Sequence, residues 1–305
     1  MIILGTAQLG MNYGLTNKQG FLTDEDGQRL LRSASQSGIV WLDTARSYGV
    51  SEKRIGAYSA CSSGESAFRV ITKLSATISP DFGDDSLFSQ IEASIYRSLY
   101  ELRTRKIDTL LLHRWAHWSL SGGKVRRVLR ALKDEGLISR LGASIYTPEE
   151  FLETLEFSDI ETLQLPCNVL DWRWREPGIR KSLMECGKEI HVRSVFLQGI
   201  LNAQSDVWPK IGGVNATKIC EILDASVARY GRKNRADLCI AYIQTFPWVT
   251  GIVLGAETPE QIEESCALGS REPLSLDQCS ELDQLLGKAP DQLLNPGQWP
   301  SVDKF

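Results

Sequence analysis

The chain has 305 residues, 42% of them hydrophobic and 24% charged, and its formal net charge is −4. These values are ordinary for a globular protein, and without a basic run they argue against a nucleic-acid or membrane partner. The N-terminus lacks the features of a signal peptide, and no apolar run is long enough to span a bilayer. The seven cysteines are scattered without a CxxC pair, so we expect reduced thiols, no metal site and a cytoplasmic location.

Strand-like and helix-like segments alternate along almost the whole chain. The expected strands, each with the helix that follows it, are 2–5 with 24–37, 40–42 with 51–60, 68–72 with 87–102, 107–112 with 125–135, 138–143 with a helix from 149, 162–165 with 177–186, 190–194 with 216–229 and 235–245, and 251–254 with a helix from 259. Eight strand–helix units with right-handed crossovers predict an α/β fold, a (β/α)8 TIM barrel. No linker interrupts the pattern, so residues 1–305 are expected to form a single domain.

The C-terminal part continues beyond the last predicted barrel helix. We expect one more helix from Leu276. The loop after it contains Pro290, Pro296, Trp299 and Pro300, and we expect it to fold over a site.

Four chemically useful side chains come at or shortly after the ends of three successive predicted strands. They are Asp43, Tyr48, Lys73 and His113. The C-terminal ends of barrel strands meet at one face, so this spacing predicts that the four side chains share one site. An acid, a phenol, an amine and an imidazole are the groups needed to pass a proton to a carbonyl oxygen while a cofactor supplies a hydride.

Each of these side chains has a role that its chemistry suggests. A nearby ammonium group is expected to stabilise the phenolate of Tyr48 and to lower its pKa from about 10. Asp43 is the natural partner of Lys73, because a lysine in a barrel mouth is costly unless it is paired. His113 is expected to hydrogen-bond the substrate carbonyl. Taken singly, the four also fit structural roles as a helix cap, a turn aromatic, a solvent-exposed lysine and a packed histidine, but only the functional interpretation explains all of them together.

The segments around these residues resemble the aldo-keto reductase superfamily. The resemblance is carried by WLDTARSYGVSEKRIG, ITKL and LLLHR, and by GTAQLG, LGAS, LQLPCN, RSVFLQGIL and VLGAETPEQIEES. It implies a (β/α)8 barrel that binds a nicotinamide dinucleotide and reduces aldehydes or ketones. The absence of a GxGxxG motif agrees with binding without a Rossmann fold. The resemblance also implies that Tyr48 is the proton donor, tuned by Lys73, which Asp43 holds, while His113 positions the carbonyl.

A cofactor site at the barrel rim is likewise implied by the resemblance. Ser144 and Gln164 would hydrogen-bond the nicotinamide carboxamide, although Ile145 stands where the family usually has Asn. Arg193 replaces the usual aromatic beneath the ring and is expected to stack or to contact a phosphate, the alternative being a pair with a carboxylate. The backbone of 194–199 would pass the pyrophosphate. The full set of expected cofactor residues is Gly5, Thr6, Asp43, Ser144, Gln164, Arg193, Ser194, Gly199, Gly255, Gln261 and Ser265.

The form of the cofactor depends on the stretch VLGAETPEQIEES. NADP(H) is predicted on family grounds. NAD(H) is the alternative, because Glu257 stands in a stretch where many NADPH-using members carry basic residues. Lys218 or residues 229–235 are expected to reach in from the preceding helices.

The substrate is expected to be a small-molecule carbonyl compound bound by loop residues. Trp115 and Trp172 are predicted to line its pocket. Arg114, Arg173 and Arg175 suggest an anionic or sugar-like compound. Two other functions stay open on the same fold, a cofactor-sensing regulatory subunit and a redox-neutral lyase or isomerase. The sequence leaves the oligomeric state undetermined.

Overall fold

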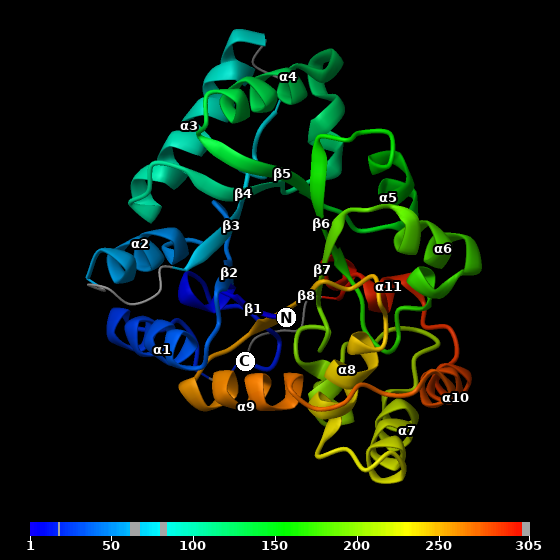
Figure 1. Cartoon of the computed structure of the whole chain (residues 1–305). Coiled ribbons are helices and arrows are strands. Elements are labelled where there is room, and N and C mark those ends of the chain that lie inside the picture. Colours follow the sequence, from blue (N-terminus) through cyan, green and yellow to red (C-terminus); the bar gives the residue numbers. More distant parts are fainter. Residues whose placement is uncertain (18, 62–67, 80–83, 301–305) are drawn as a thin grey trace.

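The computed structural model describes residues 1–17, 19–61, 68–79 and 84–300. Eight parallel strands close into a barrel in sequence order, with β8 beside β1. Figure 1 shows the ring of strands with helices around its outside. The strands are β1 (Ile2–Gly5), β2 (Trp41–Asp43), β3 (Arg69–Lys73), β4 (Ile107–Leu112), β5 (Ile138–Ser144), β6 (Ile160–Pro166), β7 (Glu189–Arg193) and β8 (Gly251–Gly255). The predicted (β/α)8 TIM barrel is confirmed.

The helices follow the strands as the apolar periodicity indicates. They are α1 (Asp24–Gln36), α2 (Ser51–Cys61), α3 (Asp84–Leu102), α4 (Leu120–Asp134), α5 (Pro148–Thr154), α6 (Pro177–Glu185), α7 (Ala216–Arg229), α8 (Arg235–Gln244), α9 (Pro259–Gly269), α10 (Leu276–Leu286) and α11 (Asp291–Leu294). Several begin at a side chain that accepts a backbone N–H in the first turn, as Thr23, Thr147 and Thr258 do. Local capping therefore fixes where these helices start. Among the described residues, no helix has both the length and the apolar character needed to cross a membrane.

Two packing layers hold the barrel together. The larger apolar clusters lie between the strands and the surrounding helices. A separate small cluster joins Ile3, Trp41, Ile71, Leu111 and Val253, which come from five neighbouring strands. This arrangement is typical of a barrel whose interior is a packed core rather than a pore.

The strand register decides where the polar side chains emerge. Gly5 of β1 pairs with Asp43, which in turn pairs with Ile71 of β3. Lys73 therefore lies two residues further along β3 than the partner of Asp43. Both Asp43 and Lys73 are the last residues of their strands, whereas the sequence pattern placed each one just after its strand. A long lysine side chain on the neighbouring strand, two residues beyond the level of the carboxylate, can reach back to it.

Candidate active site

A cavity of about 340 Å³ opens at the barrel mouth. Asp43 and Tyr48 line it from β2 and the segment that follows, while Gln261 and Ser265 line it from α9. All of the predicted cofactor residues except Ser144 and Gln164 are among its lining residues. The topology thus brings together side chains and backbone from β1, β2, β7 and β8, which are consecutive around the closed barrel.

A buried ion pair between Asp43 and Lys73 forms the base of the site. Lys73 Nζ donates to Asp43 Oδ1 at 2.7 Å, to Oδ2 at 2.8 Å and to the carbonyl oxygen of Thr44 at 3.0 Å. Their side chains are only 1% and 5% exposed. Burial lowers the pKa of Lys73, and the charge and hydrogen bonds of Asp43 oppose that shift. Asp43 therefore has the lysine partner expected of it and is not a helix cap.

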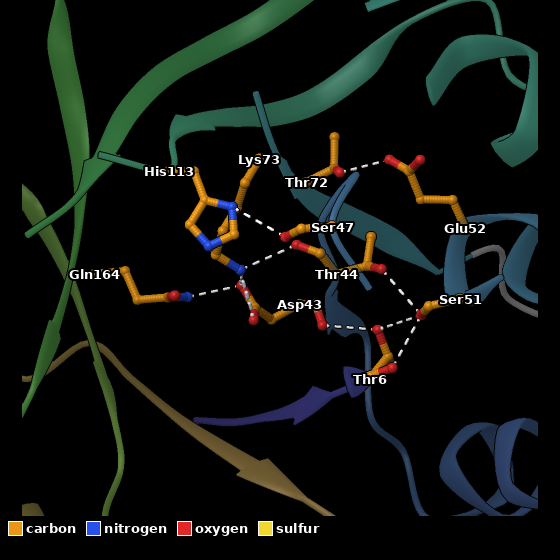
Figure 2. A network of polar contacts seen from close by, with 10 residues as sticks. All are labelled: Thr6, Asp43, Thr44, Ser47, Ser51, Glu52, Thr72, Lys73, His113 and Gln164. Atoms are coloured by element: carbon orange, nitrogen blue, oxygen red, sulfur yellow. Dashed lines mark hydrogen bonds and ion pairs between the residues drawn. The ribbon is translucent and has the colours of Figure 1, made fainter. Parts of the chain in front are cut away.

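Gln164 completes this buried cluster, in which it and Lys73 converge on the carboxylate of Asp43 (Figure 2). Gln164 Nε2 donates to Asp43 Oδ1 at 2.7 Å. Gln164 Oε1 is buried and has no hydrogen-bond partner among the described residues. Ser144, which is also buried, pairs with Gln164 in the strand register, so the two lie side by side on neighbouring strands. The side-chain nitrogen of Gln164 is thus bonded to Asp43, whereas its oxygen remains available as an acceptor.

Tyr48 lies close to the lysine but in a setting that favours its neutral form. Lys73 Nζ is 5.1 Å from the centroid of the Tyr48 ring. Burial and then the charge of Asp43 raise the pKa of Tyr48, and the charge of Arg193 opposes them. The pKa is therefore raised, not lowered as predicted from Lys73, because burial and the charge of Asp43 dominate. Tyr48 consequently keeps its proton at neutral pH.

His113 is uncharged for a related reason. Burial, followed by the charges of Lys73 and Arg193, lowers the pKa of His113 to about 3. The ring lies nearly perpendicular to Tyr48, with 6.3 Å between centroids. Its Nδ1 is 3.2 Å from Ser47 Oγ. When Nδ1 accepts from this hydroxyl, the ring hydrogen is on Nε2, which is then a donor for a carbonyl oxygen.

The segment that carries Tyr48 is tied to two strands by residues that sequence reasoning missed. Ser51 Oγ lies 2.9 Å from both the carbonyl oxygen and Oγ1 of Thr6 in the segment after β1. Glu52 accepts from Thr72 of β3 at 2.6 Å and forms an ion pair with Arg46. Both residues are buried at the start of α2. Ser51 and Glu52 end the sequence motif around Tyr48, and this position could have indicated their role.

The backbone of Gly10 lies directly against the same segment. A Cβ atom built at Gly10 would be 1.7 Å from the carbonyl oxygen of Tyr48. Gly49 has a φ of +52°, and a Cβ there would be 2.1 Å from the carbonyl oxygen of Gly10. These two glycines therefore let the chains on either side of Tyr48 approach more closely than any other residue allows.

Loops after β1 and β7 also line the cavity. Tyr13 and Thr16 come from the first loop, and Phe196 and Gln198 from the second. Gly199 has a φ of +93°, and a Cβ there would be 2.0 Å from Thr16 Oγ1. The glycine is thus needed where the two loops touch, a contact that the sequence pattern did not reveal.

The tryptophans predicted to line the substrate pocket do not line this cavity. Trp115 is 5% exposed, donates from Nε1 to Glu153 Oε2 at 2.6 Å and stacks on Trp118. Trp172 donates to the carbonyl oxygen of Ala289 at 3.0 Å and lines a separate surface depression. The acceptors of both indole N–H groups belong to the outer layer of the barrel. These hydrogen bonds hold the two rings away from the cavity.

The C-terminal tail packs on the outer layer near Trp172. The Trp299 Nε1 donates to the carbonyl oxygen of Leu293 at 2.9 Å, and its ring is packed against the main apolar cluster. None of residues 290–300 lines the cavity. The expectation that this loop folds over a site is therefore not met by residues 290–300.

The sequence model of the Aldo/keto reductase family matches residues 1–286. The chain belongs to the aldo/keto reductase family. Membership makes the protein an oxidoreductase that acts on small-molecule carbonyl compounds with a nicotinamide cofactor. No curated protein matches the sequence at a significant level.

Solved aldo-keto reductases share the fold of this one. The holo form of AKR11C1 from Bacillus halodurans superimposes with a TM-score of 0.76 at 21% sequence identity, covering 96% of this chain and 95% of that one. Its apo form gives 0.70 at 21% identity, covering 94% and 95%. PA4992 from Pseudomonas aeruginosa gives 0.64 at 22% identity, covering 88% and 89%.

A Gly10→Ala substitution in this aldo-keto reductase tests the contact that holds Tyr48. The added methyl group has to displace the Tyr48 backbone, so we expect kcat for aldehyde reduction to fall at least roughly tenfold and stability to fall by about 1–3 kcal/mol. Steady-state kinetics and urea unfolding measure the two effects. Gly178→Ala in α6 is the control, because a Cβ there meets nothing within 4 Å. Wild-type turnover in Gly10→Ala would show that the contact does not position Tyr48.

Proposed function

We propose that this aldo-keto reductase uses NAD(P)H to reduce an aldehyde or ketone to an alcohol, with Tyr48 as the proton donor. The observation that supports it most is the convergence of Tyr48, His113 and the Asp43–Lys73 pair at the barrel mouth. A neutral, protonated Tyr48 lies beside the buried Asp43–Lys73 pair and an uncharged His113. Turnover of a panel of aldehydes and sugars, measured as the loss of absorbance of the reduced cofactor, tests the activity. Tight cofactor binding with no turnover would favour a regulatory subunit.

The residues around the cavity fit a nicotinamide dinucleotide. The unpartnered, buried Gln164 Oε1 suits an amide N–H donor, so Gln164 and Ser144 would hold the carboxamide. Ser194 and the 194–199 backbone would contact the diphosphate, Gln261 and Ser265 would contact the adenosine end, and Arg193 would lie beside the nicotinamide ring. When bound, the nicotinamide supplies the hydride.

The protein's own part in the reaction is to polarise the carbonyl and to provide a proton. His113 Nε2–H and the Tyr48 hydroxyl both donate to the substrate oxygen and orient it. As negative charge develops on that oxygen, the Tyr48 hydroxyl proton moves to it. The ammonium of Lys73, 5.1 Å from the ring centroid, then stabilises the tyrosinate until a proton returns from solvent.

Two forms of the cofactor are candidates. NADP(H) follows from the family resemblance, and the charges of the cavity favour NAD(H). Glu257 and Glu264 line the cavity near α9. The arginines expected to reach in from preceding helices form ion pairs instead, as Arg229–Glu281, Arg232–Asp237 and Arg235–Asp224. Glu264 is itself paired with Lys233 of the same stretch, so a 2′-phosphate in this region would meet Glu257 and no arginine of 229–235 that lacks an ion pair.

A charge reversal at Glu257 tests this interpretation. We expect the wild-type protein to bind NADH at least as tightly as NADPH, and Glu257→Lys to raise the affinity for NADPH relative to NADH by roughly tenfold, about 1.4 kcal/mol. Tryptophan fluorescence titrations give both Kd values. Glu260→Lys, an exposed position on α9 outside the cavity lining, is the matched control. An unchanged ratio in Glu257→Lys would remove this residue from cofactor selection.

A further inference from the structure

The guanidinium group of Arg193 faces the cavity without a counter-ion. It stacks over the ring of Tyr146, with Cζ 4.4 Å from the centroid. Its Nη2 donates to the carbonyl oxygen of Ile145 at 3.3 Å, and Nη1 lies 3.5 Å from Ser194 Oγ. In the part of the chain that the structure describes, no carboxylate forms an ion pair with it. Arg193 therefore does not form the structural ion pair that was the alternative interpretation of this residue.

A second arginine, next to His113 in the chain, also lacks a counter-ion. Arg114 follows His113 directly, is exposed and has no ion pair with another described residue. The other two arginines considered for substrate recognition are already paired. Arg173 bonds both oxygens of Asp171 at 2.8 and 2.7 Å, and Arg175 pairs with Asp283. The structure thus leaves one of the three, Arg114, free to meet a ligand.

The catalytic groups themselves add no net negative charge to this region. The carboxylate of Asp43 is held by Lys73 and Gln164, and His113 is neutral. Arg193 lines the same cavity as Tyr48, and the charges of Lys73, Arg193 and Arg114 all lower the pKa of the His113 imidazole. A bound molecule next to His113 and Tyr48 therefore meets an excess of positive charge in a partly water-excluded pocket.

We propose that the preferred substrate carries an anionic group, a carboxylate or a phosphate, close to its carbonyl, and that Arg193 binds this group with Arg114 at the rim. The inference rests on the proposed carbonyl reduction. A guanidinium held flat against Tyr146 presents its N–H edge, which matches the paired oxygens of a carboxylate or phosphate. Arg193 is then a specificity residue at the position where the family usually has an aromatic side chain.

Matched pairs of aldehydes test this assignment. We compare kcat/KM for 4-carboxybenzaldehyde with its neutral methyl ester, and for glyceraldehyde 3-phosphate with glyceraldehyde. At low ionic strength we expect a preference for the anion of roughly tenfold or more in at least one pair, falling as salt is added. The pair with the larger preference tells whether the site suits carboxylate or phosphate.

Substitutions locate the preference. Arg193→Gln is expected to reduce the anion-to-neutral ratio of kcat/KM at least roughly tenfold, and Arg114→Gln by a smaller factor of about three. Arg105→Gln makes the same change in net charge in an exposed residue just before β4, at the opposite end of the barrel, and is expected to keep the ratio. Competition by benzoate against benzamide, measured by equilibrium binding, gives a readout that does not depend on turnover.

Each outcome separates this proposal from the one on which it rests. Equal rates with acid and ester would overturn the anion site while leaving the reductase activity intact. An unchanged ratio in Arg193→Gln, with only the cofactor Kd altered, would also overturn it. If no aldehyde is reduced although the cofactor binds, carbonyl reduction fails. Benzoate binding that is lost in Arg193→Gln would then still support an anion site.

Discussion

Replacing Tyr48 with Phe is expected to lower kcat for aldehyde reduction by about 10²–10⁴-fold, the usual contribution of a positioned general acid. The physical reason is that the phenol is the protonated group beside the neutral His113 ring. Phe keeps the ring that packs near Lys73 but has no proton to give. The Kd of the reduced cofactor, from fluorescence titration, is expected to stay within a few-fold of the wild-type value.

A second phenol in the cavity provides the control. Tyr13 also lines the cavity, and burial raises its pKa as well. Tyr13→Phe is expected to reduce kcat by less than roughly tenfold, because Tyr13 is not attached to the segment that Ser51 and Glu52 hold in place. If Tyr13→Phe were the more damaging substitution, the proton donor would have to be reassigned.

Replacing Lys73 with Met is expected to be the most destabilising of the substitutions considered, by about 3–5 kcal/mol. The change leaves the buried carboxylate of Asp43 with one neutral hydrogen-bond donor, Gln164, in place of an ammonium group that makes three contacts. Urea unfolding followed by tryptophan fluorescence measures the loss.

Two further variants show whether the burial of the pair is the cause. Lys133→Met breaks a partly exposed pair with Glu161, whose atoms are 2.7 Å apart, and is expected to cost no more than about 1 kcal/mol. The double variant Asp43→Asn with Lys73→Met removes both charges and is expected to regain part of the loss. Similar losses in Lys73→Met and Lys133→Met would mean that the buried charge does not determine stability here.

The sequence by itself determined the barrel and the place along the chain of the proposed catalytic groups. Apolar periodicity and helix-start signals are local, and the strand ends of a parallel barrel meet at one face. The positions of Asp43, Lys73 and His113 along the chain were therefore enough to predict that they share a site. The family segments also predicted that Gly255, at the end of β8, and Ser265, in α9, line the same cavity.

Only the tertiary structure decided how these groups are charged and which of them are free. The pKa of Tyr48 depends on burial and on a pair that already occupies Lys73, and neither is visible in the strand pattern. Trp115 turned toward Glu153, and Arg175 toward Asp283, because partners 38 and 108 residues away became available once the barrel closed. The local sequence pattern determines the element and the position from which a side chain projects. Its partners belong to elements distant in sequence, which strand register and packing bring beside it.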